Sequence, residues 1–445
     1  MKRKLLSLYL QIILDKRFIA LRRSLKDLRR KLSFKKPVVS VFLQLDDPYS
    51  YLLSYYLEHV ITRYKKVEFR FYLCQALSGD YKPQPGMLDD YAMADCAAMA
   101  REFGVPFLDV GSTPAVEYRR SLLDFLGEEH DEKDFSETFI KALSAYWRGD
   151  PEGIARIVGR AQAELSETNV LIGQNQLLLR KMGHYNCATM NYAGEWYWGV
   201  DRLHYLIERF DQQGLHRYKE PIPELASLQQ AMRLKLPATR PVKAASLPPL
   251  EMFYSFRSPY AYLALERTYE IADAFGLKLD VKPVMPMVMR GLKVPRPKLM
   301  YIVRDANREA EHLDVPFGKI ADSLGEGAER CIAAFYYAKS EGHEREFLLA
   351  AGQAIFAEAI DVASDEGMEI VAERSGLFWP DLKEALEKED WRAWAQANRD
   401  ELTDAGLWGV PSFRIGDATV WGQDRDWLLA RKIEDMCHDG EGIIV

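Results

Sequence analysis

Residues 250–266, LEMFYSFRSPYAYLALE, decide the fold because they join a strand directly to a helix. The apolar residues over 250–256 alternate as in a strand. Ser258 is a residue type that caps helix N-termini, and Pro259 fits the first helical position. We therefore expect a helix to begin at Ser258 and Pro259, immediately after the strand.

The elements that follow complete an α/β unit. We expect this helix to end at Phe275, where Gly276 provides a C-terminal cap. Residues 277–284 (LKLDVKPV) predict a second strand, parallel to the first because a helix connects them. The remaining elements are a helical stretch over 298–386, a hairpin over 409–421 and a last helix near Asp424. This order predicts a thioredoxin-like sheet with a helical subdomain inserted into it.

Three segments of this unit have partners earlier in the chain. The pairs are 38–58 with 250–266, 91–107 with 301–317, and 183–202 with 406–425. The last two pairs align without gaps, and all three occur in the same order. We therefore predict a tandem duplication with the following parts: a basic segment 1–37, a first unit 38–236, a Pro-rich linker 237–249, a second unit 250–436 and a tail 437–445.

The N-terminal segment 1–37 carries thirteen Lys or Arg residues and two Asp, a net charge of +11. Its apolar run over 5–14 is about ten residues, too short to span a bilayer. Further apolar residues recur at three- and four-residue steps between basic ones, at Phe18, Leu21, Leu25, Leu28 and Leu32. This pattern predicts a basic amphipathic helix. Such a helix either lies on an anionic membrane surface or a partner, or docks on the acidic body or a second copy.

Composition excludes several functions. The other 408 residues carry a net charge of −18, which argues against nucleic-acid binding. The cysteines are too scattered for a disulfide framework, a CxxC motif or a cysteine-based zinc site: Cys74, Cys96, Cys187, Cys331 and Cys437. The eight His form no HxxxH pair, so no metal site is expected, and no GxxxxGKS/T or GxGxxG pattern occurs. We expect a cytoplasmic protein, and the membrane alternative for the basic segment would place it at the inner face of a membrane.

The motifs of the second unit resemble the 2-hydroxychromene-2-carboxylate isomerase and kappa-class glutathione transferase family, which has a DsbA-like thioredoxin fold. The resemblance spans residues 250–430 and rests on SPYAYLA from Ser258, KLMYIVRDANR from Lys298, VPF at 315–317, GVPSF at 409–413 and WGQDR at 421–425. It implies a glutathione-dependent isomerase or transferase that acts on an aromatic or electrophilic small molecule. It also implies that the two units form a pseudo-dimer within one chain.

The resemblance implies a glutathione site in the second unit. Ser258 corresponds to the family's thiol-contacting serine, and no dithiol exchange is possible because SPYA replaces CxxC. Val410 precedes the family's cis-proline, here Pro411, and its backbone would pair with the tripeptide. Gln423 and Asp424 correspond to the positions that hold the γ-glutamyl end.

Further cleft residues are expected from the same comparison: Arg257, Tyr260, Lys298, Tyr301, Asp305 and Arg308. Each has a structural alternative. Ser258 and Asp424 also suit helix caps, and Asp305 and Arg308 suit an ordinary ion pair one turn apart. Lys298 also fits a solvated side chain, and Tyr301 a core residue. The loop 287–298 (MVMRGLKVPRPK) lacks the Asn that family members use to hold glutathione.

The first unit lacks the matching groups. Asp47 replaces Ser258, and a carboxylate there would repel a thiolate, so only its capping role is retained. Ala188 replaces Pro411, so we expect a trans bond, and Cys187 before it is expected to be a buried apolar residue. Ala98 replaces Arg308. We therefore interpret this unit as structural. The alternative function is a non-catalytic DsbA-like binding or scaffold protein, tethered through residues 1–37.

Overall fold

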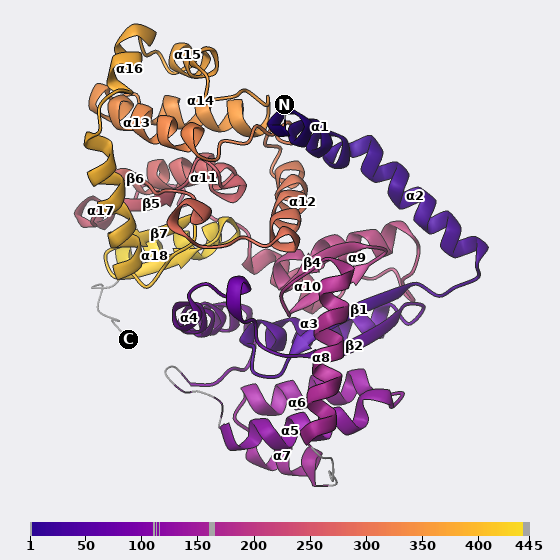
Figure 1. Cartoon of the computed structure of the whole chain (residues 1–445). Coiled ribbons are helices and arrows are strands. Elements are labelled where there is room, and N and C mark those ends of the chain that lie inside the picture. The colour runs from indigo at the N-terminus through magenta and orange to yellow at the C-terminus, as the bar shows by residue number, and fades with distance from the viewer. Residues whose placement is uncertain (1, 110–111, 113, 115, 160–164, 439–445) are drawn as a thin grey trace. The chain divides into compact units, whose positions relative to one another are not determined.

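The computed structural model describes residues 2–109, 112, 114, 116–159 and 165–438. Contacts divide the chain into two compact units (Figure 1). The C-terminal unit comprises Met1–Ala20, Met232–Val294 and Ile302–Val445, and the N-terminal unit comprises Leu21–Ala231 and Pro295–Tyr301. Two segments thus group differently from the domain bounds expected from the sequence: the start of the basic segment, and residues 295–301.

The C-terminal unit contains a four-stranded sheet within the described residues. Its strands are β5 (Leu250–Tyr254), β6 (Leu279–Pro283), β7 (Ser412–Ile415) and β8 (Ala418–Trp421), in the order β6-β5-β7-β8. Strand β5 runs parallel to β6 and antiparallel to β7, with Met252 opposite both Val281 and Phe413. The central strand is buried on both faces because helices cover the sheet on either side.

Helix α11 (Pro259–Phe275) confirms the predicted strand-to-helix junction. Ser258 is its N-cap, and the Ser258 hydroxyl accepts a hydrogen bond of 3.2 Å from the Ala261 N–H. Gly276 ends the helix at φ 74°, a left-handed conformation that favours glycine. Local sequence signals therefore determine both ends of α11.

The predicted helical insertion is also present. It comprises α12 (Arg296–His312), α13 (Glu326–Glu341), α14 (Glu344–Phe356), α15 (Asp365–Arg374), α16 (Trp379–Ala385) and α17 (Asp390–Asp404). After the sheet's last strand, the short 3-10 helix η6 (Gln423–Arg425) leads into the last helix, α18 (Asp426–His438). Helix α14 approaches α11 closely, since a Cβ at Gly352 would lie 2.5 Å from the Tyr262 ring. Within the predicted linker, η4 (Val242–Ser246) contacts α18 and buries Ala244.

The N-terminal unit has a sheet of the same strand order and directions within its described residues. The strands are β1 (Val38–Gln44), β2 (Glu68–Cys74), β3 (Thr189–Tyr192) and β4 (Glu195–Trp198), in the order β2-β1-β3-β4. Its helices are α3 (Pro48–Arg63), α4 (Pro85–Phe103), α5 (Val116–Glu128), α6 (Phe135–Trp147), α7 (Pro151–Val158), α8 (Leu165–Met182), α9 (Leu203–Gln212) and α10 (Pro223–Ala231). The basic segment forms α1 (Lys2–Leu14) and α2 (Lys16–Leu32).

Each unit contains the same two tyrosine hydrogen bonds, at matched sequence positions. The Tyr262 hydroxyl donates to the Pro316 carbonyl at 2.9 Å, and the Tyr51 hydroxyl donates to the Pro106 carbonyl. In the same way, Tyr260 donates to Asp305 and Tyr49 donates to Asp95, each at 2.8 Å. The units therefore agree in sheet order and also in these tyrosine hydrogen bonds.

Candidate active site

The candidate site lies where α11 begins beside the start of β7. The Ser258 hydroxyl donates a hydrogen bond of 3.3 Å to the Val410 carbonyl and accepts one from the Ala261 N–H. The Val410–Pro411 peptide bond is cis, as predicted, and it is the one cis bond within the described residues. A half-buried hydroxyl at the positive end of a helix suits a bound anion such as a thiolate.

Arg257 precedes this serine, but its charge is already paired. Its Nε donates to Asp322 Oδ1 at 3.3 Å, and the same carboxylate oxygen accepts from the Leu324 N–H at 3.2 Å. An acidic partner at this distance offsets much of the attraction that the guanidinium would exert on a thiolate. Arg257 therefore contributes less positive potential to the site than the sequence suggests.

Tyr260, Asp305 and Arg308 lie together, between the first turn of α11 and helix α12. Arg308 Nη2 donates to Asp305 Oδ1 at 2.6 Å, while the Tyr260 hydroxyl donates to Oδ2. Asp305 is only 1% exposed. The ion pair one turn apart, the structural alternative for these residues, is therefore present. The hydrogen bond from Tyr260 to Asp305 connects α12 to α11, the helix that Ser258 caps.

Gln423 and Asp424 differ in what they offer to a ligand. Gln423 is buried: Arg267 Nη2 donates to its Oε1 at 2.9 Å, and its Nε2 donates to Glu309 Oε2 at 2.7 Å. Both ends of the amide thus bind side chains of the protein itself, and the ligand contact expected from the sequence stays a prediction. Asp424 keeps its carboxylate partly exposed, 3.6 Å from Arg425 Nη1.

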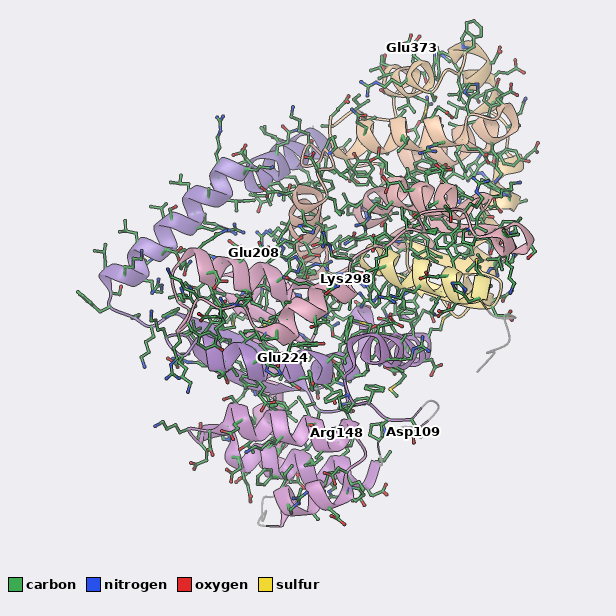
Figure 2. All side chains as sticks on the ribbon, turned by 180° about the vertical axis from the view of Figure 1, so that it is seen from behind. Asp109, Arg148, Glu208, Glu224, Lys298 and Glu373 are labelled. Carbon is green, nitrogen blue, oxygen red and sulfur yellow. The ribbon has the colours of Figure 1, made fainter. Side chains whose placement is uncertain are left out.

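Lys298 and Tyr301 group with the N-terminal unit, and both contact aromatic side chains of that unit. The Tyr301 ring is buried, with its centroid 4.7 Å from that of His184 and 5.8 Å from that of Trp198. Lys298, labelled in Figure 2, has its Nζ 5.8 Å from the Tyr185 ring centroid, and burial lowers the pKa of its amine. Aromatic packing thus makes Tyr301 a core residue, the alternative left open by the sequence.

Sequence reasoning missed Arg290, which lies in η5 (Met287–Arg290), within the loop that lacks the expected Asn. Its Nη2 donates to the Trp408 carbonyl at 2.8 Å, two residues before Val410. Burial lowers the pKa of Arg290 to about 10, and the nearby Arg399 adds to this effect. The signal available in the sequence was a basic residue in the loop 287–298, where the resemblance leads one to expect a ligand-holding Asn.

The matching position in the N-terminal unit is built around a carboxylate. Asp47 caps α3, accepting hydrogen bonds from the Ser50 N–H at 3.0 Å and the Ser50 hydroxyl at 2.6 Å. Burial raises the pKa of Asp47 to about 6. The capping role predicted for Asp47 is confirmed.

Cys187 and Ala188, the counterparts of Val410 and Pro411, have the backbone conformation and burial expected from the sequence. The bond before Ala188 is not among the cis bonds of the described residues, and Ala188 has φ 54°. Cys187 is buried, and its thiol donates to the Gln75 carbonyl at 3.7 Å. A hydrogen bond with Cys74, together with burial, raises the pKa of Cys187 well above its usual value. Cys187 is therefore a buried thiol with little thiolate character.

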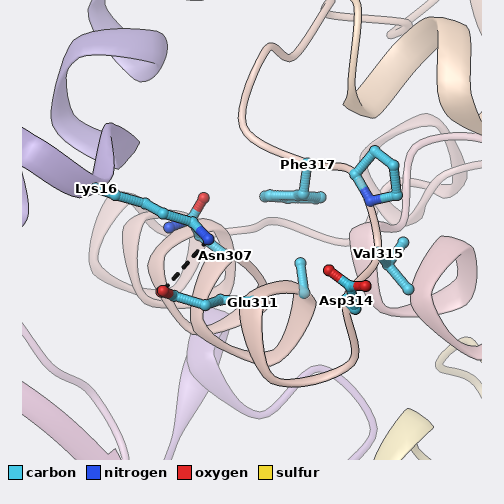
Figure 3. A pocket seen from close by; sticks show the side chains of 8 residues that line it. Lys16, Asn307, Glu311, Asp314, Val315 and Phe317 are labelled. Carbon is cyan, nitrogen blue, oxygen red and sulfur yellow. Dashed lines mark ion pairs between the residues drawn. The ribbon is translucent and has the colours of Figure 1, made fainter.

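A separate pocket lies on the C-terminal unit beside α12 (Figure 3). Its lining includes Asn307, Asp314 and Phe317, and Lys16 and Glu311 form an ion pair of 3.4 Å across it. None of the residues predicted for the glutathione site lines this pocket.

The described part of the chain contains no group of three or more His, Cys, Asp or Glu residues that could hold a metal ion. None of its helices is both long and apolar enough to cross a membrane.

Comparisons with known proteins agree with this fold. Residues 249–434 match the family described as the DSBA-like thioredoxin domain. The 2-hydroxychromene-2-carboxylate isomerase of Pseudomonas putida is 26% identical over 204 residues, which cover 42% of this chain and 95% of that protein. The enzyme of the same name from Sphingobium xenophagum is 25% identical over 184 residues, covering 40% of this chain and 93% of that protein.

Solved structures of similar proteins cover a comparable share of the chain. A 2-hydroxychromene-2-carboxylate isomerase is 20% identical, with a TM-score of 0.39, over 44% of this chain and 99% of its own. A probable DsbA oxidoreductase from Streptomyces coelicolor is 15% identical, with a TM-score of 0.35, over 43% of this chain and 90% of its own. The family match therefore shows that this chain carries a DSBA-like thioredoxin domain over residues 249–434.

Proposed function

We propose that the chain is a glutathione-dependent isomerase or transferase of the 2-hydroxychromene-2-carboxylate isomerase type, acting from its C-terminal unit. The observation that carries the proposal is the hydrogen bond between the Ser258 hydroxyl and the Val410 carbonyl, beside the cis-proline Pro411. It places a hydroxyl donor at the N-terminus of α11, where negative charge is favoured. The names of the curated relatives support the same reaction class.

In the proposed reaction, the glutathione thiolate adds to a conjugated double bond of an aromatic or electrophilic substrate. The double bond becomes a single bond and rotates, and the thiolate then leaves with its electron pair, so no net oxidation occurs. A transferase would retain the carbon–sulfur bond instead. Ser258 would turn its hydroxyl from Val410 to the sulfur and hold it as the thiolate.

The remaining residues would position the tripeptide. The backbone of Val410 would pair with it as an added strand, and the Asp424 carboxylate would bind its α-ammonium group. Arg290, which contacts the Trp408 carbonyl, would contribute a cation where family members use an Asn. Dithiol exchange is not part of the proposal because Ser258-Pro259-Tyr260-Ala261 contains no thiol.

We further propose that the N-terminal unit is a non-catalytic copy that arose by tandem duplication and pairs with its neighbour as a pseudo-dimer. The matched sheet orders and matched tyrosine hydrogen bonds support this origin. Asp47 and Ala188 replace the serine and the cis-proline, and the Asp47 carboxylate would raise a thiol pKa rather than lower it. Free, buried cysteines are in keeping with a cytoplasmic location.

Thermal unfolding with and without glutathione tests the site. Glutathione at one hundred times its dissociation constant should add about 2.7 kcal/mol to the free energy of unfolding. We expect Ser258→Ala and Asp424→Ala to reduce this gain. Asp201→Ala, the matched change in the N-terminal unit, should leave the gain intact. If millimolar glutathione causes no stabilisation, the enzyme proposal is wrong.

A non-catalytic binding protein is the second candidate. It is favoured by Gln423, whose amide is used within the protein, and by Arg257, which pairs with Asp322. This candidate predicts that the thermal-unfolding experiment shows no glutathione effect in any variant.

A further inference from the structure

Helix α2 is attached to the N-terminal unit by its polar face. Arg23 donates three hydrogen bonds to the Glu195 carboxylate, from Nε at 3.0 and 3.2 Å and from Nη2 at 2.8 Å. Lys26 Nζ donates to the Ala193 carbonyl at 2.5 Å. Gln213, which follows α9, donates to Asp27 at 2.7 Å. All these contacts lie within the N-terminal unit, on the β3–β4 turn and the end of α9.

Glu195 is the main anchor. Besides Arg23, its carboxylate lies 3.3 Å from Arg209 Nη1 and 3.7 Å from Arg22 Nη2. Burial would raise the pKa of Glu195, but the hydrogen bond from Arg23 and the charges of these arginines lower it. A carboxylate held by three guanidinium groups keeps its charge and fixes the orientation of α2.

The opposite face of α2 is apolar and exposed. Its four leucines are each more than half exposed: Leu21, Leu25, Leu28 and Leu32. At 100° per residue these positions form one stripe, on the far side of the helix from Arg23 and Arg30. The usual orientation of an amphipathic helix, with its apolar face on the core, is therefore reversed here.

The residues around the stripe are basic. By the same helical geometry, the exposed side chains of Arg29 and Lys31 flank it on its two sides. Phe34 follows at 97% exposure, and the exposed Lys35 and Lys36 come after it. An apolar stripe between cations matches the two layers of a lipid surface, because the leucines suit the acyl boundary and the cations suit anionic headgroups.

We propose that the leucine stripe of α2 binds an anionic membrane surface, with the N-terminal unit held to the helix through Glu195. The basic residues beside the stripe favour a negatively charged lipid layer as its partner. They disfavour the same stripe of a second copy, which carries the same positive charges.

Co-sedimentation of the full chain with phosphatidylcholine vesicles, with and without phosphatidylserine, tests this proposal. We expect binding only to the phosphatidylserine vesicles, and weaker binding as salt is raised. The double variant Leu25→Asp/Leu28→Asp should bind at least ten-fold more weakly. The matched control Val242→Asp changes a residue that is 92% exposed outside α2, and it should bind as the wild type does.

A second variant tests the cations without disturbing the stripe. Arg29→Gln/Lys31→Gln should lose most of its binding to phosphatidylserine vesicles while its thermal unfolding stays unchanged. The proposal is overturned if the wild type ignores anionic vesicles or if the leucine variant binds as well as the wild type. It is also overturned if the leucine variant turns a dimer into a monomer in light scattering, because a second copy would then cover the stripe. Glutathione binding should be equal in all these variants.

Discussion

The hydroxyl of Ser258 serves two purposes at once, as a helix cap and as a donor toward the proposed sulfur position. The cap requires only that its oxygen accept from the Ala261 N–H, so the proton remains available. That proton is directed at the Val410 carbonyl at 3.3 Å, a long hydrogen bond that a bound thiolate could replace. Ser258 can therefore cap α11 and still donate a hydrogen bond to the sulfur in the proposed reaction.

Replacing this serine should change the acidity of bound glutathione. A hydrogen bond to a charged group is worth about 1.5–3 kcal/mol, so Ser258→Ala should raise the pKa of the bound thiol by roughly one to two units. The ultraviolet absorbance of the thiolate, titrated against pH, measures this shift. An unchanged thiol pKa in a variant that still binds glutathione would show that Ser258 is only a cap.

Asp47 should impose a pH dependence on stability. Its pKa is raised to about 6 in the folded state, so between about pH 4 and pH 6 the folded chain holds more protons than the unfolded chain. Stability therefore falls as pH rises through this window, and above it the loss caused by ionised Asp47 is complete and no longer changes with pH. Asp47→Asn keeps a cap residue and removes the titration.

Denaturant unfolding of this variant beside the wild type checks the prediction. The advantage of Asp47→Asn should grow with pH, reaching up to about 3 kcal/mol above pH 6. Parallel pH profiles for the two proteins would contradict the prediction.

At the scale of elements, the sequence predicted what local signals control. The ends of α11 follow from Ser258 and Gly276, which act on their own helix, and the cis bond follows from Pro411 in its motif. The surroundings of Tyr301 could not be predicted in this way, because its partner His184 lies more than one hundred residues away. The internal partners of Gln423 could not be predicted for the same reason, since Arg267 and Glu309 come from other helices.

The contact between α11 and α14 provides a test of packing. A Cβ at Gly352 would overlap the Tyr262 ring, so Gly352→Ala should destabilise the chain by about 1–3 kcal/mol. The control is Gly173→Ala in α8, where a Cβ meets nothing within 4 Å and should stabilise by about 0.5–1 kcal/mol. Chemical denaturation measures both. Equal effects of one sign would show that the helices have room to separate.

At the scale of the whole molecule, two units of one sheet order carry different chemical groups. The C-terminal unit has a hydroxyl and a cis-proline where the N-terminal unit has a buried carboxylate and an alanine. The sequence predicted this contrast because aligned motifs reveal substitutions residue by residue. The orientation of α2 was not predictable, since its amphipathic pattern is equally compatible with either face turned inward.

Calorimetric titration of the full chain with glutathione tests the central claim most directly, because it counts sites as well as measuring affinity. We predict one glutathione per chain, with binding lost or greatly weakened in Ser258→Ala and unchanged in Asp201→Ala. Two equivalents per chain, or binding indifferent to Ser258→Ala, would contradict a single site in the C-terminal unit. A titration without heat or saturation at millimolar glutathione would contradict a glutathione-dependent enzyme altogether.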